Sequence, residues 1–173
     1  MNSLIIYFSR AGENYVNGQI LNLKTGNTEI IAKKIAELID GNLYKIEPIV
    51  EYSKDYSECL EETINDKKRN ARPELKHYLK DLKAYDVIFL GYPNYWESLP
   101  MPVLTFLEKY DFKDKIIKPF CTHEGGGFGD SIEKIKKICK GAKVKQGLDI
   151  FGIECLNIKE ILPKLEEWIK LDL

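Results

Sequence analysis

Little in this chain of 173 residues indicates metal binding, disulfide bonds or a membrane span. The four cysteines lie far apart without a CxxC pair, and the only histidines are His77 and His123. These residues do not have the spacings of the usual metal-ligand clusters. No apolar run approaches the roughly 20 residues of a membrane span, and the first residues lack the basic region of a signal peptide. We therefore expect a cytoplasmic protein with reduced thiols and no metal.

The chain also lacks a charge excess of either sign. Its 26 Lys and Arg residues nearly balance 27 Asp and Glu residues, which gives a formal net charge of -1. Such a chain has no long-range field to attract nucleic acid or an anionic membrane. With 44% apolar and 31% charged residues, it has the composition of an ordinary globular protein. Its length predicts a single domain over residues 1–173.

Short apolar runs alternate with segments of helical periodicity along the chain. We expect five strands, at residues 4–8, 43–46, 86–91, 115–121 and 144–150. Between and after them, helices are expected near residues 27–40, 55–70, 102–107, 130–141 and 158–169. Alternating strands and helices predict a parallel sheet with helices on both faces. The expected fold class is therefore a doubly wound, three-layer α/β domain around a five-stranded parallel sheet.

One segment interrupts this alternation between the first strand and the first helix. Asn17-Gly18 stands between the apolar pairs Tyr15-Val16 and Ile20-Leu21. Asn-Gly between apolar residues favours a two-residue β-hairpin turn. We predict a small hairpin inserted at this point, as either a lid over a site or an interface element.

Three segments that follow predicted strands have unusual compositions, and ligands bind at the carboxyl ends of strands in such sheets. The first joins Ser9-Arg10 to Gly26-Asn27-Thr28, at the expected start of a helix. Free backbone N–H groups and a partial positive charge at a helix N-terminus suit a phosphate. The alternative is that Asn27 and Thr28 only cap the helix, because caps use the same residue types.

The second segment is crowded with aromatic residues and prolines, where a connecting loop is normally polar. It contains Pro93, Asn94, Tyr95 and Trp96. A flat ring system could stack on Tyr95 or Trp96, which indicates a planar ligand. The alternative is aromatic packing beneath a surface loop or at a dimer contact.

The third segment runs from Thr122 to Asp130 and is rich in glycine. It includes His123, Glu124, Gly125, Gly126 and Gly127, whose glycines allow a backbone to approach a ligand closely. It matches neither of the common glycine-rich phosphate motifs, because position 130 is Asp and no Lys follows the glycines. The alternative is a flexible turn before a helix. His123 has no paired nucleophile, so a structural role is favoured over acid–base work.

Together these segments resemble the flavodoxin-like family, in particular its short bacterial flavoproteins, over nearly the whole chain. The resemblance is carried by Tyr7-Phe8-Ser9-Arg10, Gly26-Asn27-Thr28, Gly91-Tyr92-Pro93-Asn94-Tyr95-Trp96, Pro100-Met101-Pro102 with Phe106-Leu107-Glu108, and Phe120-Cys121-Thr122-His123-Glu124-Gly125-Gly126. It implies the strand order 2-1-3-4-5 and one FMN bound without a covalent bond.

The same resemblance implies the cofactor-binding residues. They are Ser9, Arg10, Ala11, Asn27, Thr28, Pro93, Asn94, Tyr95, Trp96, Thr122, His123, Glu124, Gly125, Gly126 and Gly127. Ser9, Asn27 and Thr28 would hold the phosphate, and the other two loops would line the isoalloxazine ring. In many relatives the phosphate loop is continuous, whereas the hairpin divides it here and brings Asn14 or Tyr15 beside the cofactor.

Three functions fit this resemblance. The leading one is electron transfer through FMN between a reductase and an acceptor, with no catalytic residue assigned. The second is an NAD(P)H-dependent FMN oxidoreductase acting on quinones, azo or nitro compounds; the weak net charge favours it over an acidic carrier. The third is a flavodoxin-fold module for protein contact. The expected partners are a redox protein, or NAD(P)H and a small acceptor, and both monomer and homodimer fit.

Overall fold

The apolar runs become the strands of one parallel sheet in the computed structural model, which describes residues 1–171. Its strands are β1 (Ser3–Tyr7), β4 (Asn42–Lys45), β5 (Val87–Pro93), β6 (Ile116–His123), β7 (Lys143–Val144) and β8 (Leu148–Phe151). The order is β4-β1-β5-β6, and β6 then pairs with both β7 and β8. The predicted strand order 2-1-3-4-5 and the α/β class are confirmed.

The fifth predicted strand is two strands, so the sheet has six strands in place of five. β7 pairs with the start of β6 and β8 with its end. Between β7 and β8, Gly147 lies against the ring of Phe128, where a Cβ would be 2.4 Å from Cζ. Next to it, the carbonyl oxygen of Gln146 accepts a hydrogen bond from Trp168 Nε1 at 2.9 Å.

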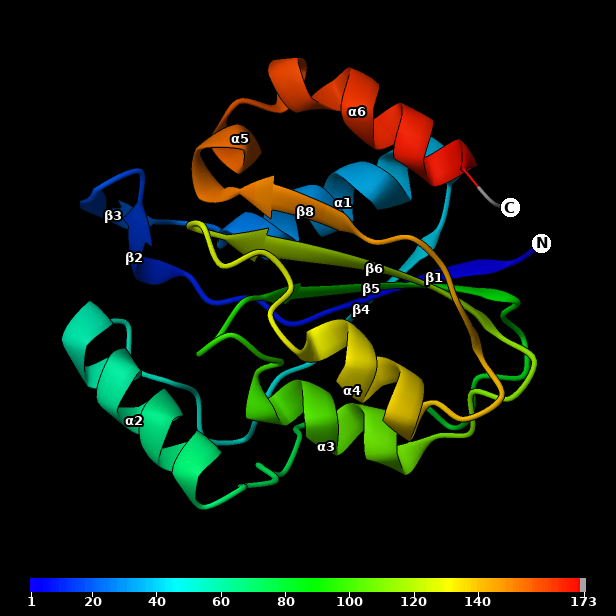
Figure 1. The fold of residues 1–173 in the computed structure, drawn as a ribbon, viewed down its shortest axis with the longest axis horizontal. Helices are drawn as coiled ribbons and strands as arrows, with labels where there is room; N and C mark the ends of the chain where they lie inside the picture. Colours follow the sequence, from blue (N-terminus) through cyan, green and yellow to red (C-terminus); the bar gives the residue numbers. More distant parts are fainter. Residues whose placement is uncertain (172–173) are drawn as a thin grey trace.

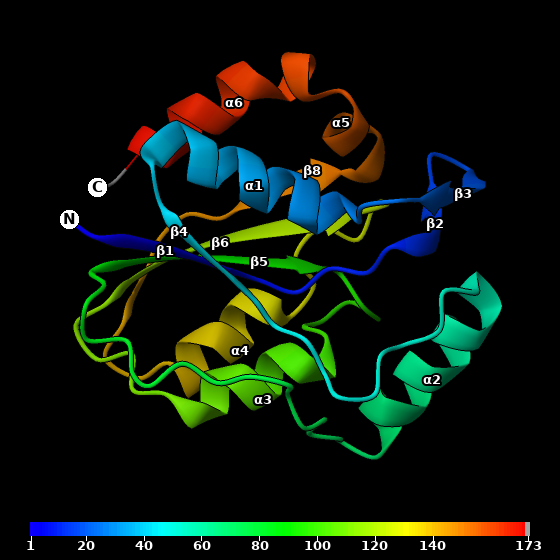
Figure 2. The same ribbon diagram turned by 180° about the vertical axis from the view of Figure 1, so that it is seen from behind.

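Helices cover both faces of the sheet (Figure 1). On one face lie α1 (Asn27–Ile39), α5 (Gly152–Leu156) and α6 (Ile158–Lys170), and on the other α3 (Met101–Lys109) and α4 (Ser131–Ile138). The remaining helix, α2 (Tyr56–Lys68), stands beyond the carboxyl ends of the strands, as both views show (Figure 2). In residues 1–171, no helix has the length and apolar character needed to cross a membrane.

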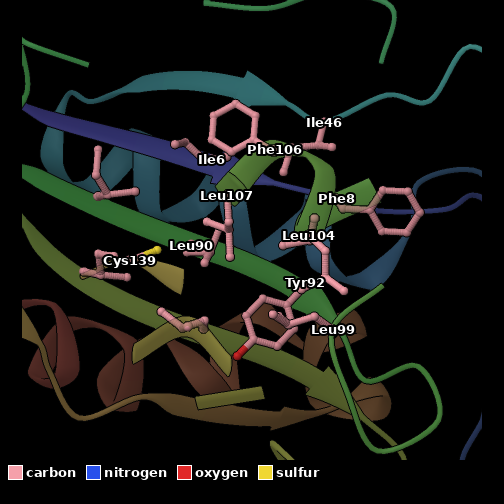
Figure 3. Packing of buried hydrophobic residues seen from close by; sticks show 14 of the residues in the cluster. Ile6, Phe8, Ile46, Leu90, Tyr92, Leu99, Leu104, Phe106, Leu107 and Cys139 are labelled. Carbon is pink, nitrogen blue, oxygen red and sulfur yellow. The ribbon is translucent and has the colours of Figure 1, made fainter. Parts of the chain in front are cut away.

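Two cores result from the alternation of side chains along the buried strands. In β1, Leu4 and Ile6 point toward α3 and α4, and Ile5 and Tyr7 point toward α1 and α6. Figure 3 shows the first of these cores, where Phe106 of α3 packs among strand side chains. Both faces of the sheet are thus closed by apolar packing, which leaves the strand ends as the place for a ligand.

The predicted hairpin is present as β2 (Gly12–Val16) and β3 (Gln19–Leu23), a separate antiparallel sheet. Asn17 and Gly18 form its turn with φ angles of 48° and 85°, the left-handed conformations that this turn type requires. The hairpin lies at the carboxyl end of the parallel sheet, between α2 and α5 (Figures 1 and 2).

Candidate functional site

A cavity of about 230 Å³ opens at the carboxyl ends of β1, β5 and β6. Most of the residues predicted for the site line it: Ser9, Arg10, Asn27, Thr28, Pro93, Asn94, Tyr95, Trp96, Thr122, His123 and Glu124. The other predicted residues, Ala11, Gly125, Gly126 and Gly127, lie outside its lining. Three loops that are distant in sequence therefore meet at one place.

The start of α1 forms one wall of the cavity. Gly26 is the N-cap and supplies no side-chain cap, so Ser9 Oγ accepts the hydrogen bond from Glu29 N at 3.1 Å. Other N–H groups of the first turn have no partner within the helix. Gly26 is required here, because a Cβ would lie 2.3 Å from Ser9 Oγ. This arrangement is a short cradle of backbone donors, which suits an anion.

Asn27 and Thr28 of this cradle differ in how the fold uses them. Thr28 Oγ1 and Thr122 Oγ1 are 2.7 Å apart, a buried hydrogen bond that joins α1 to the end of β6. Asn27 Oδ1 is buried and has no hydrogen-bond partner in the described part of the chain. An unsatisfied buried polar group costs about 1–3 kcal/mol. The fold thus holds an acceptor beside the cavity without using it.

The loop after β5 makes a tight turn that presents Trp96. Trp96 and Glu97 have φ angles of 56° and 59°, which are unfavourable for residues other than glycine. Two backbone hydrogen bonds between Tyr95 and Ser98 close the turn. Gly129 packs beneath it, since a Cβ there would lie 2.0 Å from the carbonyl oxygen of Glu97. The surroundings hold this strained turn in place.

The two aromatic residues of this turn point in different directions. Trp96 is 38% exposed, and its Nε1 donates to Thr63 Oγ1 of α2 at 3.0 Å. The ring of Tyr95 packs inward, 5.9 Å from the ring of Phe8. Burial raises the pKa of the Tyr95 hydroxyl, and nearby Cys59 adds to the rise while Arg10 opposes it. Trp96 is therefore the one available for stacking, whereas Tyr95 supports the cavity from below.

The loop after β6 is held by His123. Its Nδ1 accepts a hydrogen bond from Gly125 N at 2.9 Å, so its Nε2 carries the proton and donates to Asp149 Oδ2 at 3.2 Å. The ring also lies 4.5 Å from the ring of Phe151. Asn94 supports the same loop, because its Nδ2 donates to the carbonyl oxygen of Gly127 at 2.7 Å. Both nitrogens of His123 are occupied, in agreement with the structural role favoured by the sequence.

One wall of the cavity comes from α2, which the sequence analysis did not assign to the site. The residues from this helix are Tyr56, Cys59, Leu60 and Thr63, and Asn14 and Tyr15 of the hairpin complete the lining. The α2 residues follow the i, i+3, i+4, i+7 pattern of one helix face, a signal that could have identified them. Burial raises the pKa of the Cys59 thiol, with Arg10 opposing the rise.

No group of His, Cys, Asp and Glu side chains in residues 1–171 could hold a metal ion. The four cysteines are buried free thiols. The cavity thus has an anion cradle on one side, an exposed indole on another, and Thr122, His123 and Glu124 at the end of β6 facing them.

Comparisons with known proteins agree with this geometry. The sequence model of the family described as Flavodoxin matches residues 19–170. Two solved structures of candidate flavoproteins from Bacteroides species are similar to the structure of this chain. The Bacteroides uniformis structure has 26% identity and a TM-score of 0.67, with 94% of this chain and 97% of that chain covered. The Bacteroides eggerthii structure has 27% identity and a TM-score of 0.67, with 94% and 98% covered.

A flavoprotein in complex with FMN from Lactobacillus acidophilus shares the fold at lower identity. It is 19% identical with a TM-score of 0.62, and the comparison covers 95% of this chain and 98% of that chain. The curated protein sequences gave no match.

Proposed function

The chain belongs to the flavodoxin family, and from this premise we propose that its cavity binds one FMN non-covalently and that the protein transfers electrons through it. FMN supplies the redox chemistry, and the protein supplies binding, orientation and control of access. The observation that carries the proposal is the convergence on one cavity of an anion cradle, an exposed indole and the end of β6 with Glu124.

The residues at the start of α1 fit the phosphate and the sugar chain of FMN. Ser9, Asn27 and Thr28 surround the first turn of α1, where backbone N–H groups favour a phosphate. The unpartnered Asn27 Oδ1 is a buried acceptor, and a ribityl hydroxyl is a donor that would satisfy it. Asn27 and the helix N-terminus thus match both polar parts of the ligand.

The loops after β5 and β6 fit the ring system. Pro93, Asn94 and Trp96 line one side of the cavity, and Thr122, His123 and Glu124 line another. An exposed indole offers a flat apolar surface, and offset stacking of aromatic systems stabilises by about 0.5–1.5 kcal/mol. These loops hold and orient the ring without adding a proton donor, since both nitrogens of His123 are already hydrogen-bonded.

A second function is favoured by the balance of charge. With a formal net charge of -1, the chain has little long-range attraction for a basic protein partner. An NAD(P)H-dependent oxidoreductase acting on quinones, azo or nitro compounds needs no such attraction. Its partners would be NAD(P)H and a small acceptor in place of a redox protein.

Two measurements test these proposals in order. Absorption spectroscopy with FMN titration should show flavin bands or saturable binding of one FMN per chain. Absence of FMN binding would instead support the alternative of a flavodoxin-fold module for protein contact. Steady-state oxidation of NAD(P)H with a quinone then separates the two redox roles. Turnover without a partner protein would favour the oxidoreductase, and turnover only with an added reductase would favour the carrier.

A further inference from the structure

The first strand of the β2–β3 hairpin is fastened to α2. Glu13 N donates to the carbonyl oxygen of Lys54 at 2.8 Å, and Tyr56 N donates to Glu13 Oε2 at 3.0 Å. The rings of Tyr15 and Tyr56 are stacked with centroids 6.3 Å apart and an interplanar angle of 25°. These contacts fix one side of the hairpin to the wall of the cavity that α2 provides.

The base of the hairpin is equally well held. The Arg10 guanidinium donates to the backbone carbonyls of Glu13 and Ser53. Asn14 Nδ2 donates to the carbonyl oxygens of Arg10 at 3.2 Å and of Gly12 at 3.1 Å. The base therefore has several bonds to independent parts of the chain, and none of them depends on the turn.

Fewer hydrogen bonds hold the turn of the hairpin, Asn17-Gly18, than hold its base. Of the hydrogen bonds in residues 1–171, one joins the turn to another element: Asn17 N donates to Glu124 Oε2 at 2.9 Å. The two residues are 107 positions apart in sequence, and Glu124 lies in the loop across the cavity from α2. Asn17 and Gly18 are exposed. The hairpin thus spans the site and is closed at its far end by one carboxylate.

Gly152 of α5 lies close to the end of the Glu124 side chain. A Cβ at Gly152 would lie 2.1 Å from Glu124 Oε1 and 2.8 Å from Asn27 Nδ2. The same distances place the carboxylate close to Asn27 at the start of α1. Glu124 therefore stands where the hairpin tip, α1 and α5 meet.

We propose that Glu124 is a positioning residue that fastens the hairpin across the site and thereby sets how slowly FMN leaves it. The inference rests on the proposed function, because it concerns retention of that cofactor. Asn14 and Tyr15 of the hairpin line the cavity on one side and Glu124 lines it on another, so the hydrogen bond between Asn17 and Glu124 would have to open before FMN could leave between these two walls. An isolated two-stranded hairpin is only marginally stable, and hydrogen bonds to charged groups are stronger than neutral ones.

The test compares FMN dissociation rates of the wild-type protein, Glu124→Ala and Glu124→Gln by stopped-flow fluorescence. Glu124→Gln keeps an acceptor for Asn17 N–H and removes only the charge. We expect Glu124→Ala to release FMN up to about tenfold faster than Glu124→Gln, the size of effect expected for one hydrogen bond to a neutral acceptor. Equal rates for the two variants, or slower release from Glu124→Ala, would overturn the proposal.

A matched control separates the fastening from the general effect of charge. Glu97 is exposed in the loop on the other side of the cavity and is not among the lining residues. Glu97→Gln should leave the dissociation rate within about twofold of wild type, since it breaks no contact with the hairpin. An acceleration equal to that of Glu124→Ala would overturn the assignment to Glu124.

Hydrogen exchange of the Asn17 amide supplies a readout that needs no FMN. In the FMN-free protein the amide should be protected in the wild type and Glu124→Gln, and exchange faster in Glu124→Ala; an unprotected wild-type amide would overturn the proposal. A wild-type protein that binds no FMN defeats the proposed function. A protein that binds FMN but releases it equally fast with alanine or glutamine at position 124 defeats only the fastening role.

Discussion

The two ends of β6 hold buried polar groups in opposite ways. Near its start, Lys118 is 1% exposed, and its Nζ donates to the carbonyl oxygens of Trp168, Ile169 and Leu171 at the end of α6. At its other end, Thr122 faces a cavity beside Asn27, whose buried Oδ1 has no partner in the described chain. The first end uses its buried polar group for the fold, whereas beside the second end Asn27 of α1 holds a buried acceptor that the described fold does not use.

The difference shows that burial alone does not mark a site. The ammonium group of buried Lys118 donates to carbonyl oxygens at the end of α6, where a cation is favourable, and lies near the rings of Phe89 and Trp168. The unpartnered group at the carboxyl end of the strands is the informative one. The predictions below test this contrast.

The largest expected effect is on stability, at the start of β6. Lys118→Met should lower the free energy of unfolding by about 2–4 kcal/mol, because it leaves buried carbonyl oxygens without their donor. Chemical denaturation measures it, with Lys143→Met as the exposed control on neighbouring β7. FMN affinity of the folded fraction should stay the same. Loss of FMN affinity without loss of stability would contradict the assignment of Lys118 to the fold.

Asn27→Ala should weaken FMN binding without weakening the fold, the opposite of Lys118→Met. Its Oδ1 is a buried acceptor without a partner in the described chain, so its removal relieves the cost of that unsatisfied group and should raise the free energy of unfolding of the FMN-free protein by up to about 1–3 kcal/mol. FMN affinity should fall about tenfold, the loss expected from one or two ligand hydrogen bonds. Isothermal titration against Asn65→Ala, an exposed asparagine of α2, measures the effect. Unchanged affinity would mean that the orphaned acceptor does not face the ligand.

The smallest expected effect concerns Glu29, which lies in the first turn of α1 but is satisfied within the protein. Partial burial would raise its pKa, but hydrogen bonds from Lys33 and Lys45 outweigh burial and hold the pKa below the usual range. A lowered carboxyl pKa stabilises the fold above the unfolded pKa, about 4.3, and this contribution disappears as the pH falls through the folded pKa.

Glu29→Gln should therefore cost up to about 1 kcal/mol at pH 7 and nothing near pH 3. Thermal melts across this range provide the measurement, and FMN affinity at pH 7 should stay within about twofold of wild type. A loss of stability that does not change with pH would show that the ion pairs of Glu29 with Lys33 and Lys45 do not cause it.

The sequence predicted the parts of this molecule that depend on local patterns. The alternation of strands and helices and the Asn17-Gly18 hairpin follow from apolar runs and turn chemistry, whereas the strand order was implied by the family resemblance. The Tyr56 face of α2 was missed, because surrounding charges indicate a solvated helix and only tertiary packing places that face against the cavity. Periodicity likewise could not show that the last predicted strand is divided into β7 and β8.

The contact between Glu124 and Asn17 could not be predicted from the sequence either, because it joins residues that are 107 positions apart. The family match begins at residue 19, the first residue of β3, so β2 and the turn lie outside it. The family model therefore does not cover the part of the hairpin that contacts Glu124.

The most direct test of the central claim is an equilibrium titration of the purified protein with FMN and, in parallel, with riboflavin. If the start of α1 holds the phosphate, FMN should bind one to one, and riboflavin, which lacks the phosphate, should bind at least about tenfold more weakly. No saturable binding of FMN would contradict the claim of a flavin site. Equal binding of the two flavins would contradict the placement of the phosphate at Ser9, Asn27 and Thr28.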